Sequence, residues 1–154
     1  MNAVAHAVTN ELQWLVFFLA GQAYAAPLVQ VSEVVRDGAV TPVPGAADDL
    51  LGIRLLRGQI VPVLDGRARL GLDLATGTSA QARIVVLTHG GHQVGVRVDA
   101  VDDLLSLNDV DMAPAPSGRA QRVDDPVRGV VPWRQGFVAL LDVRKLCRLP
   151  QDGD

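Results

Sequence analysis

At 154 residues the chain is long enough for one domain, or for two small lobes that share a core. Hydrophobic residues make up 49% and charged residues 20%, which indicates a globular core and argues against disorder. The net charge is −3 without a basic block, so the composition gives little support to nucleic-acid binding. One cysteine, Cys147, excludes an internal disulfide framework and fits a reducing cytoplasm. The apolar run 14–20 is too short for a bilayer span and follows no cationic segment, so neither membrane insertion nor secretion is expected.

The first part of the chain is expected to begin with a flexible lead-in over residues 1–12. Residues 12–19 and 22–26 predict a strand pair, with Ala20-Gly21 as the turn. Residues 28–35 have nearly helical apolar spacing but also β-branched residues, so helix and strand both stay open. Residues 41–45 (TPVPG) predict an extended segment stiffened by proline.

Residues 52–65 (GIRLLRGQIVPVLD) predict a β-hairpin, with two apolar runs separated by Arg57-Gly58-Gln59. Gly58 suits the turn position that needs a positive φ, and Arg57 is a lone cation at the tip. The second run, residues 60–64, is apolar on both faces and is expected to be buried on both sides. Asp65 suits an N-cap for a short turn over residues 67–70, and Gly71 suits its left-handed end.

The second half predicts further short strands. They are expected over residues 82–87, 94–98, 130–131 and 137–141, with His89-Gly-Gly-His92 as a hairpin tip and a mixed pattern over 101–107. Residues 113–128 predict a solvated loop, and Asp142 is expected to cap a helix that runs to about Leu149, followed by a tail over 150–154. Many short strands with little helix predict a mainly β fold of the barrel or sandwich class.

An internal echo indicates two related β halves. Gly52 and Gly129 are 77 positions apart (129 − 52 = 77), and the same offset relates Arg57 to Arg134 and Asp65 to Asp142. Residues 26–35 parallel 96–105 at offset 70. The predicted lobe pseudo-repeats are about 22–80 and 82–149, and strand 13–19 could pack with either of them. Generic strand composition is the alternative explanation of the echo.

No arrangement of residue types predicts an active site. His89 and His92 lie at a turn tip without a third ligand, so we expect no metal site. Cys147 has no paired histidine and fits a small buried hydrophobe. The adjacent acids Asp102-Asp103 are expected in a turn or loop, where solvation explains them. We therefore expect no enzyme, no catalytic residue and no cofactor; the rival class, a small enzyme with a pocket between lobes, would need a convergent cluster of titratable groups.

Two exposed charges need another explanation. Arg57 at the tip of an apolar hairpin and Glu33 within residues 31–35 are either ordinary solvated residues or parts of a docking surface. Two lobes with proline-stiffened edges favour a docking module that binds through a groove or a sheet edge.

The order of motifs resembles the CheW family of chemotaxis coupling proteins. The motifs that carry the resemblance are LVFFLAGQAY (15–24), TPVPG (41–45), LGIRLLRGQIVPVLD (51–65), VGVRVDAV (94–101), LLSL (104–107), APAP (113–116) and LLDVRKL (140–146). The resemblance covers about residues 13–149. The chain departs from the family where Leu55 replaces the asparagine that usually precedes Leu-Arg-Gly, and where Ala25 and Ala26 follow Tyr24.

The resemblance implies two five-stranded SH3-like β-barrel lobes sharing a hydrophobic core, with short helices and a C-terminal helix. It also implies a non-enzymatic, cytoplasmic adaptor, recruited to membrane receptor arrays, that joins the tip of methyl-accepting chemoreceptors to the regulatory domain of the histidine kinase CheA. Partner-binding roles carry over to Val31, Glu33, Arg57 and Gly58. Open alternatives are a coupler for twitching motility or another chemosensory array, and a module that competes for receptors without binding the kinase.

The expected mechanism holds two partners at a fixed geometry through apolar edge contacts. Val31 is expected to anchor a partner, and rim charges are expected to set the register. Glu33 and Arg57 are expected to pair across the surface, and such an exposed pair contributes only about 0.2–1 kcal/mol to stability.

Overall fold

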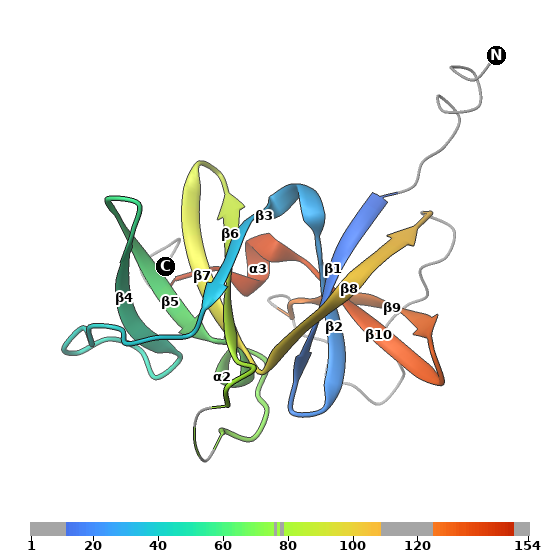
Figure 1. Cartoon of the computed structure of the whole chain (residues 1–154), viewed down its shortest axis with the longest axis horizontal. Helices are drawn as coiled ribbons and strands as arrows, with labels where there is room; N and C mark the ends of the chain where they lie inside the picture. Colours follow the sequence, from blue (N-terminus) through green and yellow to red (C-terminus); the bar gives the residue numbers. More distant parts are fainter. Residues whose placement is uncertain (1–11, 76, 78, 109–124, 150–154) are drawn as a thin grey trace.

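The computed structural model describes residues 12–75, 77, 79–108 and 125–149, and their strands form two five-stranded sheets lying side by side (Figure 1). The predicted mainly β fold with two five-stranded lobes is confirmed. The strands are β1 (Leu12–Leu19), β2 (Gln22–Pro27), β3 (Val31–Arg36), β4 (Leu50–Leu56), β5 (Gln59–Asp65), β6 (Arg83–His89), β7 (His92–Val98), β8 (Ala100–Leu107), β9 (Val127–Trp133) and β10 (Gly136–Leu141). The described helical turns are η1 (Leu28–Gln30), α2 (Gly66–Arg69) and α3 (Val143–Leu146).

The two lobes are not contiguous halves of the chain. One sheet has the order β3-β6-β7-β5-β4 and forms what we call the central lobe; the other has the order β8-β1-β2-β10-β9 and forms the terminal lobe. The expected pseudo-repeats at 22–80 and 82–149 therefore do not coincide with the two sheets, because β2 belongs to the terminal lobe while β6 and β7 belong to the central one. The N-terminal strand, β1, pairs with β2 and β8.

The internal echo is nevertheless visible in the strand pairing. One copy comprises β1–β5 with α2, the other β6–β10 with α3, and each sheet takes two strands from one copy and three from the other. The parallel pair Val63↔Gly95 in the central lobe has its counterpart in Leu140↔Ala25 in the terminal lobe. The two copies are thus interleaved, so neither lobe is complete without strands from both.

Three apolar clusters fill the fold. The largest is shared by both lobes and takes one face of β1 and one face of β6, including Phe17, Leu19, Val85 and Leu87. The opposite faces fill the lobe interiors, with Trp14 and Val16 in the terminal lobe and Ile84 and Val86 in the central lobe. Strands buried on both faces explain the continuous apolar runs in the sequence.

Most local predictions are confirmed. The strand pair β1–β2 turns at Ala20-Gly21, β4–β5 turns at Arg57-Gly58, and β6–β7 turns at Gly90-Gly91. Asp65 accepts a hydrogen bond from the Arg67 backbone N–H at 3.0 Å and so caps α2, while Asp142 caps α3 in the same way through the Lys145 N–H. The open choice at 28–35 resolves into a 3-10 turn followed by strand β3.

Four expectations differ from the structure. Ile60 is 68% exposed, because the start of β5 projects beyond the shared core. Helix α3 ends at Leu146 rather than near Leu149, with Cys147 as its C-cap. Asp102 and Asp103 lie in strand β8, not in a turn. Of the predicted loop 113–128, residues 113–124 lie outside the described residues, and Val127 already begins β9.

The predicted terminal segments fall almost wholly outside the description. Residues 1–11 and 150–154 are not among the described residues, whereas Leu12, the last residue of the expected lead-in, begins β1.

Gly52 in β4 is required by a close backbone approach. Its φ is 155°, and a Cβ atom at this position would lie 2.7 Å from the carbonyl carbon of Thr41. The two segments are joined here by hydrogen bonds of 2.8 and 2.9 Å between Thr41 and Ile53. Any side chain on Gly52 would force these segments apart, so this glycine holds the 41–45 segment against the central lobe.

Candidate functional site

The tip of the β4–β5 hairpin has a tight turn with two residues of positive φ. Arg57 has φ 50° and Gly58 has φ 79°. Two successive positive φ angles produce the right-handed twist that a two-residue hairpin needs. The sequence predicted this conformation only for Gly58, since a non-glycine residue rarely adopts it. The turn therefore projects the Arg57 side chain from a stiff position at the end of the central lobe.

Arg57 and Glu33 form the predicted surface pair, with two nitrogens of the guanidinium facing the carboxylate. Arg57 Nε donates to the two oxygens of Glu33 at 3.3 and 3.2 Å, and Nη2 donates to Oε1 at 3.1 Å. The hydrogen bonds and the charge of Glu33 raise the pKa of Arg57 further above its ordinary value. The side chain of Arg57 is 79% exposed and that of Glu33 21%, so solvent screens the pair and its value lies in orientation.

Exposed apolar side chains flank this ion pair. Leu55 and Ile60 are direct cross-strand neighbours and are 69% and 68% exposed. We call the set Glu33, Leu55, Arg57, Gly58 and Ile60 the hairpin-tip surface. Two exposed apolar side chains beside an oriented charge are typical of a docking site rather than of a plain solvated turn.

Two shallow grooves border the hairpin-tip surface. One, of about 270 Å³, is lined by Ser32, Glu33, Leu56, Arg57, Gln59 and Gln93. The other, of about 590 Å³, lies between Ile60, Pro62 and the β6–β7 turn with His89 and His92. Gln59 and Gln93 line both grooves, so the two grooves are neighbours on this surface.

Val31 occupies a different position from the other three predicted binding residues. Its side chain is partly buried and packs against the shared core, and its backbone pairs with Leu87 of β6. The structure thus brings Glu33, Arg57 and Gly58 together on one surface, with Val31 behind them at the start of the same strand. Leu55 and Ile60, which the sequence did not single out for binding, provide the exposed apolar area.

The terminal lobe carries similar features at or next to the equivalent positions. Arg134, 77 positions after Arg57, pairs with Asp102 at 2.7 Å, one residue before Asp103, which is 70 positions after Glu33. Phe137, 77 positions after Ile60, is 46% exposed, and Leu104, 70 positions after Val34, is also 46% exposed. Arg134 additionally lies 4.0 Å from the ring centre of Trp133. This second surface was missed because Asp102 was expected in a solvated loop, although the offset of Arg134 already pointed to it.

The possible metal ligands of the described residues are scattered. In the described part of the chain, no three histidine, cysteine or acidic side chains are grouped so that they could hold a metal ion. His89 and His92 face each other across the β6–β7 turn. No helix within the described ranges is long and apolar enough to cross a membrane.

Cys147 is confirmed as a buried residue, packed in the shared core at 3% exposure. Burial raises the pKa of its thiol from an ordinary 9.0 to about 12, against a smaller lowering by the charge of Arg69. A thiol held neutral in this way is a poor nucleophile.

This raised pKa makes stability depend on pH in one direction. Because the folded pKa lies above the unfolded one, the contribution of the neutral thiol is complete below about pH 9 and is lost as pH rises toward 12. In that pH window the free energy of unfolding of the wild type should fall by about 1.4 kcal/mol per pH unit relative to that of Cys147→Ala. Urea unfolding of both proteins at pH 8 and pH 10.5 measures the difference, and parallel losses in the two proteins would contradict it.

The chain is similar to known proteins over most of its length. The family model described as a CheW-like domain matches residues 13–151. A chemotaxis protein CheW from Rhizobium meliloti (strain 1021) is 30% identical over 142 residues, covering 92% of this chain and 91% of that protein. Protein FrzA from Myxococcus xanthus is 29% identical over 154 residues, covering 94% and 91%.

A solved structure is similar over almost the whole chain. The scaffolding protein TtCheW from Thermoanaerobacter tengcongensis superimposes with a TM-score of 0.81 at 26% identity, covering 93% of this chain and 97% of that one. The two interleaved SH3-like lobes, the family match over residues 13–151 and these relatives lead to one conclusion: the chain belongs to the CheW-like family of chemotaxis scaffolding proteins.

Proposed function

We propose that this protein is a non-enzymatic coupler that joins the cytoplasmic tip of a methyl-accepting chemoreceptor to the regulatory domain of a CheA-type histidine kinase. It would act in the cytoplasm and be recruited to receptor arrays at the membrane. The observation that carries the proposal is the hairpin-tip surface, where the Arg57–Glu33 pair lies among exposed apolar side chains on a scaffold of the CheW-like family.

In the proposed mechanism, the protein holds the side chains of the hairpin-tip surface in a fixed arrangement to which a partner binds. Leu55 and Ile60 offer apolar area that a partner can cover, and the charges of Arg57 and Glu33 fix the register of that partner. Val31 is partly buried against the shared core, and the part of its side chain that stays exposed would anchor a partner beside this surface. Influence on the kinase would come from contacts that differ between its active and inactive arrangements.

Arg57→Ala tests the proposal. We expect the melting temperature to stay nearly unchanged, since the pair is exposed, while binding of the receptor tip or of the kinase regulatory domain weakens about 5- to 30-fold. Calorimetry with each purified partner measures this. Arg144→Ala is the matched control, because it removes the same charge from an exposed position on α3.

The possible outcomes separate the alternatives. Unchanged binding of both partners would reject the role of Arg57. Wild-type binding to the receptor tip without binding to the kinase domain would identify a receptor-competing module instead. Kinase domains from a flagellar pathway and from another chemosensory array, tested side by side, would show which pathway the protein serves.

A further inference from the structure

The chain passes between the two lobes at two places within the described residues. It leaves the terminal lobe through η1, between β2 and β3, and returns through a single residue, Asp99, between Val98 of β7 and Ala100 of β8. Because only one residue connects β7 to β8, the chain has little freedom to change direction at the second crossing. The relative orientation of the lobes at this end therefore depends on what holds Asp99.

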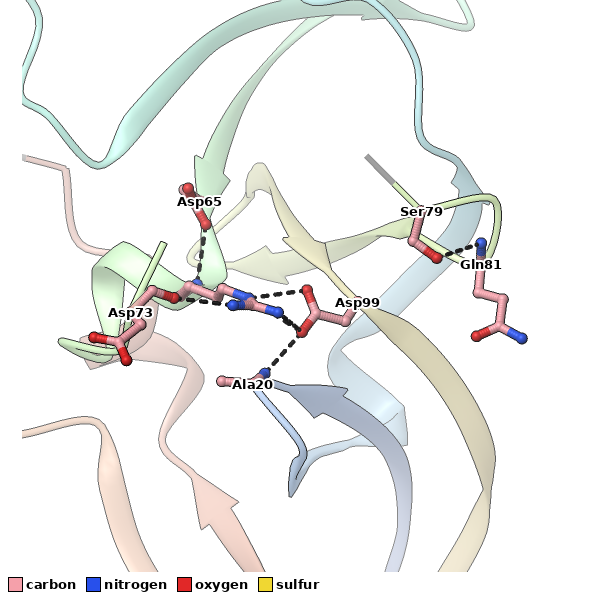
Figure 2. Close-up of polar contacts among 7 residues, drawn as sticks. Ala20, Asp65, Asp73, Ser79, Gln81 and Asp99 are labelled. Carbon is pink, nitrogen blue, oxygen red and sulfur yellow. Dashed lines mark hydrogen bonds and ion pairs between the residues drawn. The ribbon is translucent and has the colours of Figure 1, made fainter. Parts of the chain in front are cut away.

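Asp99 binds both lobes at once. Its backbone N–H donates to the carbonyl of Phe18 at 2.9 Å, and its Oδ2 accepts from the backbone N–H of Ala20 at 2.7 Å, in the β1–β2 turn of the terminal lobe (Figure 2). The same carboxylate receives Arg67, whose Nη2 donates at 2.7 Å and whose Nε donates at 3.2 and 3.1 Å. Arg67 belongs to α2, which packs on β5 and β7 of the central lobe.

Arg67 is held in place for this contact. The Asp65 cap fixes the backbone N–H of Arg67, and Arg67 Nη1 donates to the carbonyl of Asp73 at 3.0 Å (Figure 2). The side chains of Arg67 and Asp99 are 21% and 31% exposed, so solvent screens the pair only in part. Both residues line a groove together with Asp37 and Arg97. These hydrogen bonds hold the Arg67 guanidinium in one preferred orientation toward Asp99.

The second arginine of α2 reaches the helical turn of the other copy. Arg69 donates to the carbonyls of Leu146 and Lys145 at 2.8 and 2.6 Å, at the end of α3. This four-residue helix thus contacts α3 of the other copy through Arg69 and the one-residue crossing through Arg67.

Among the described residues, the other crossing has no comparable charged contact. The position equivalent to Asp99 at offset 70 is Val29 in η1, which is 87% exposed. A valine side chain can neither donate nor accept a hydrogen bond. The charged link between the lobes is therefore a feature of one crossing and not a general consequence of the repeated fold.

We propose that Arg67 and Asp99 are positioning residues that set the orientation of the two lobes, and that this orientation transmits receptor control to the kinase. This inference rests on the proposed coupling function. Neither residue belongs to the hairpin-tip surface, so removing their link should leave each partner's binding site intact. It should change only how the two bound partners are held relative to each other.

Asp99→Ala and Arg67→Ala test the inference, with Asp37→Ala as the matched control. Asp37 pairs with Arg97 at 3.0 Å and lines the same groove. This pair does not join the two lobes, because Arg97 belongs to β7 and Asp37 directly follows β3, both in the central lobe. Should Asp99→Ala fail to fold, Asp99→Asn replaces it, because it keeps an oxygen for the Ala20 N–H and removes the charge opposite Arg67.

The first readout is the distance distribution between spin labels on Thr88→Cys in the central lobe and Gln135→Cys in the terminal lobe. Both positions are exposed, and the buried Cys147 does not compete for the label. We expect the distribution to broaden or shift in the Asp99 and Arg67 variants and to stay unchanged in the Asp37 variant.

The second readout is receptor control of kinase activity in the assembled ternary complex. We expect each partner alone to bind within about threefold of wild type, while the change in kinase activity on receptor stimulation falls by about tenfold. An unchanged distance distribution overturns the inference, and so does a changed distribution with intact receptor control. Wild-type protein that binds neither partner would refute the proposed function, whereas the spin-label distances judge the link between the lobes on their own.

Discussion

Replacing Ile84 by alanine should destabilise both lobes together, although Ile84 lies only in the interior of the central lobe. Ile84 is fully buried among Val61, Val63 and Val86, so the truncation removes packed methylene groups and leaves a cavity. Such changes lower the free energy of unfolding by about 2–5 kcal/mol. Because each sheet contains strands from both copies of the repeat, the loss should not stay confined to the central lobe.

Tryptophan fluorescence reads this coupling directly. Both tryptophans, Trp14 in β1 and Trp133 in β9, lie in the terminal lobe, whereas the mutation lies in the central lobe. In urea unfolding, the fluorescence midpoint of Ile84→Ala should fall together with the far-ultraviolet dichroism midpoint in one transition.

Two further variants complete that experiment. Val138→Ala, in the interior of the terminal lobe, should shift the same two curves in the same direction, and Val29→Ala, at an exposed position, should shift neither. The lobes would be shown to unfold separately if Ile84→Ala kept the wild-type fluorescence midpoint and its dichroism curve had two steps.

The elements that could be predicted from the sequence are those set by local chemistry. Asp65 and Asp142 were expected to cap short helices, and both do so, because a carboxylate can accept from the free N–H groups that follow it. The Arg57-Gly58 turn and the Arg57–Glu33 pair were likewise found where they were expected.

What the sequence could not specify is which copy of the repeat supplies each strand. The pairs Val63↔Gly95 and Leu140↔Ala25 join residues from different copies, and the same apolar alternation would satisfy pairing within one copy. The strand pattern defines faces but not partners, so the interleaving had to come from the structure. For the same reason Asp99 carried no signal as a link, since its partners Ala20 and Arg67 are distant in the chain.

Exposure was the other property that the sequence misjudged. Ile60 continues an apolar run, yet it lies past the end of the shared core and is 68% exposed beside Leu55. Leu55 is the residue that departs from the asparagine usual in the family. This departure therefore adds apolar area at the hairpin tip, where an amide would otherwise lie.

Ile60→Asp should abolish most of the affinity for whichever partner docks on the central lobe, while leaving the fold intact. The substitution places a charge within the apolar area of the hairpin-tip surface, and truncation of a central anchor typically costs about 2 kcal/mol or more, which is about 30-fold in affinity. Stability should change little, because the side chain is already largely in solvent. Leu55→Asn should weaken the same partner by a smaller factor.

Two matched variants make the result specific. Leu74→Asp places the same charge at another exposed apolar residue, which is 63% exposed and lines the groove beside Arg67 and Asp99 rather than the grooves at the hairpin tip, and it should leave binding unchanged. Phe137→Asp changes the equivalent position of the terminal lobe. If the two lobes serve different partners, Ile60→Asp and Phe137→Asp should each weaken a different one in calorimetric titrations. If Ile60→Asp weakened the binding of both partners equally and Phe137→Asp weakened neither, both binding sites would lie on the central lobe. If both variants kept their affinity for both partners, the hairpin tips would not be part of the docking surface.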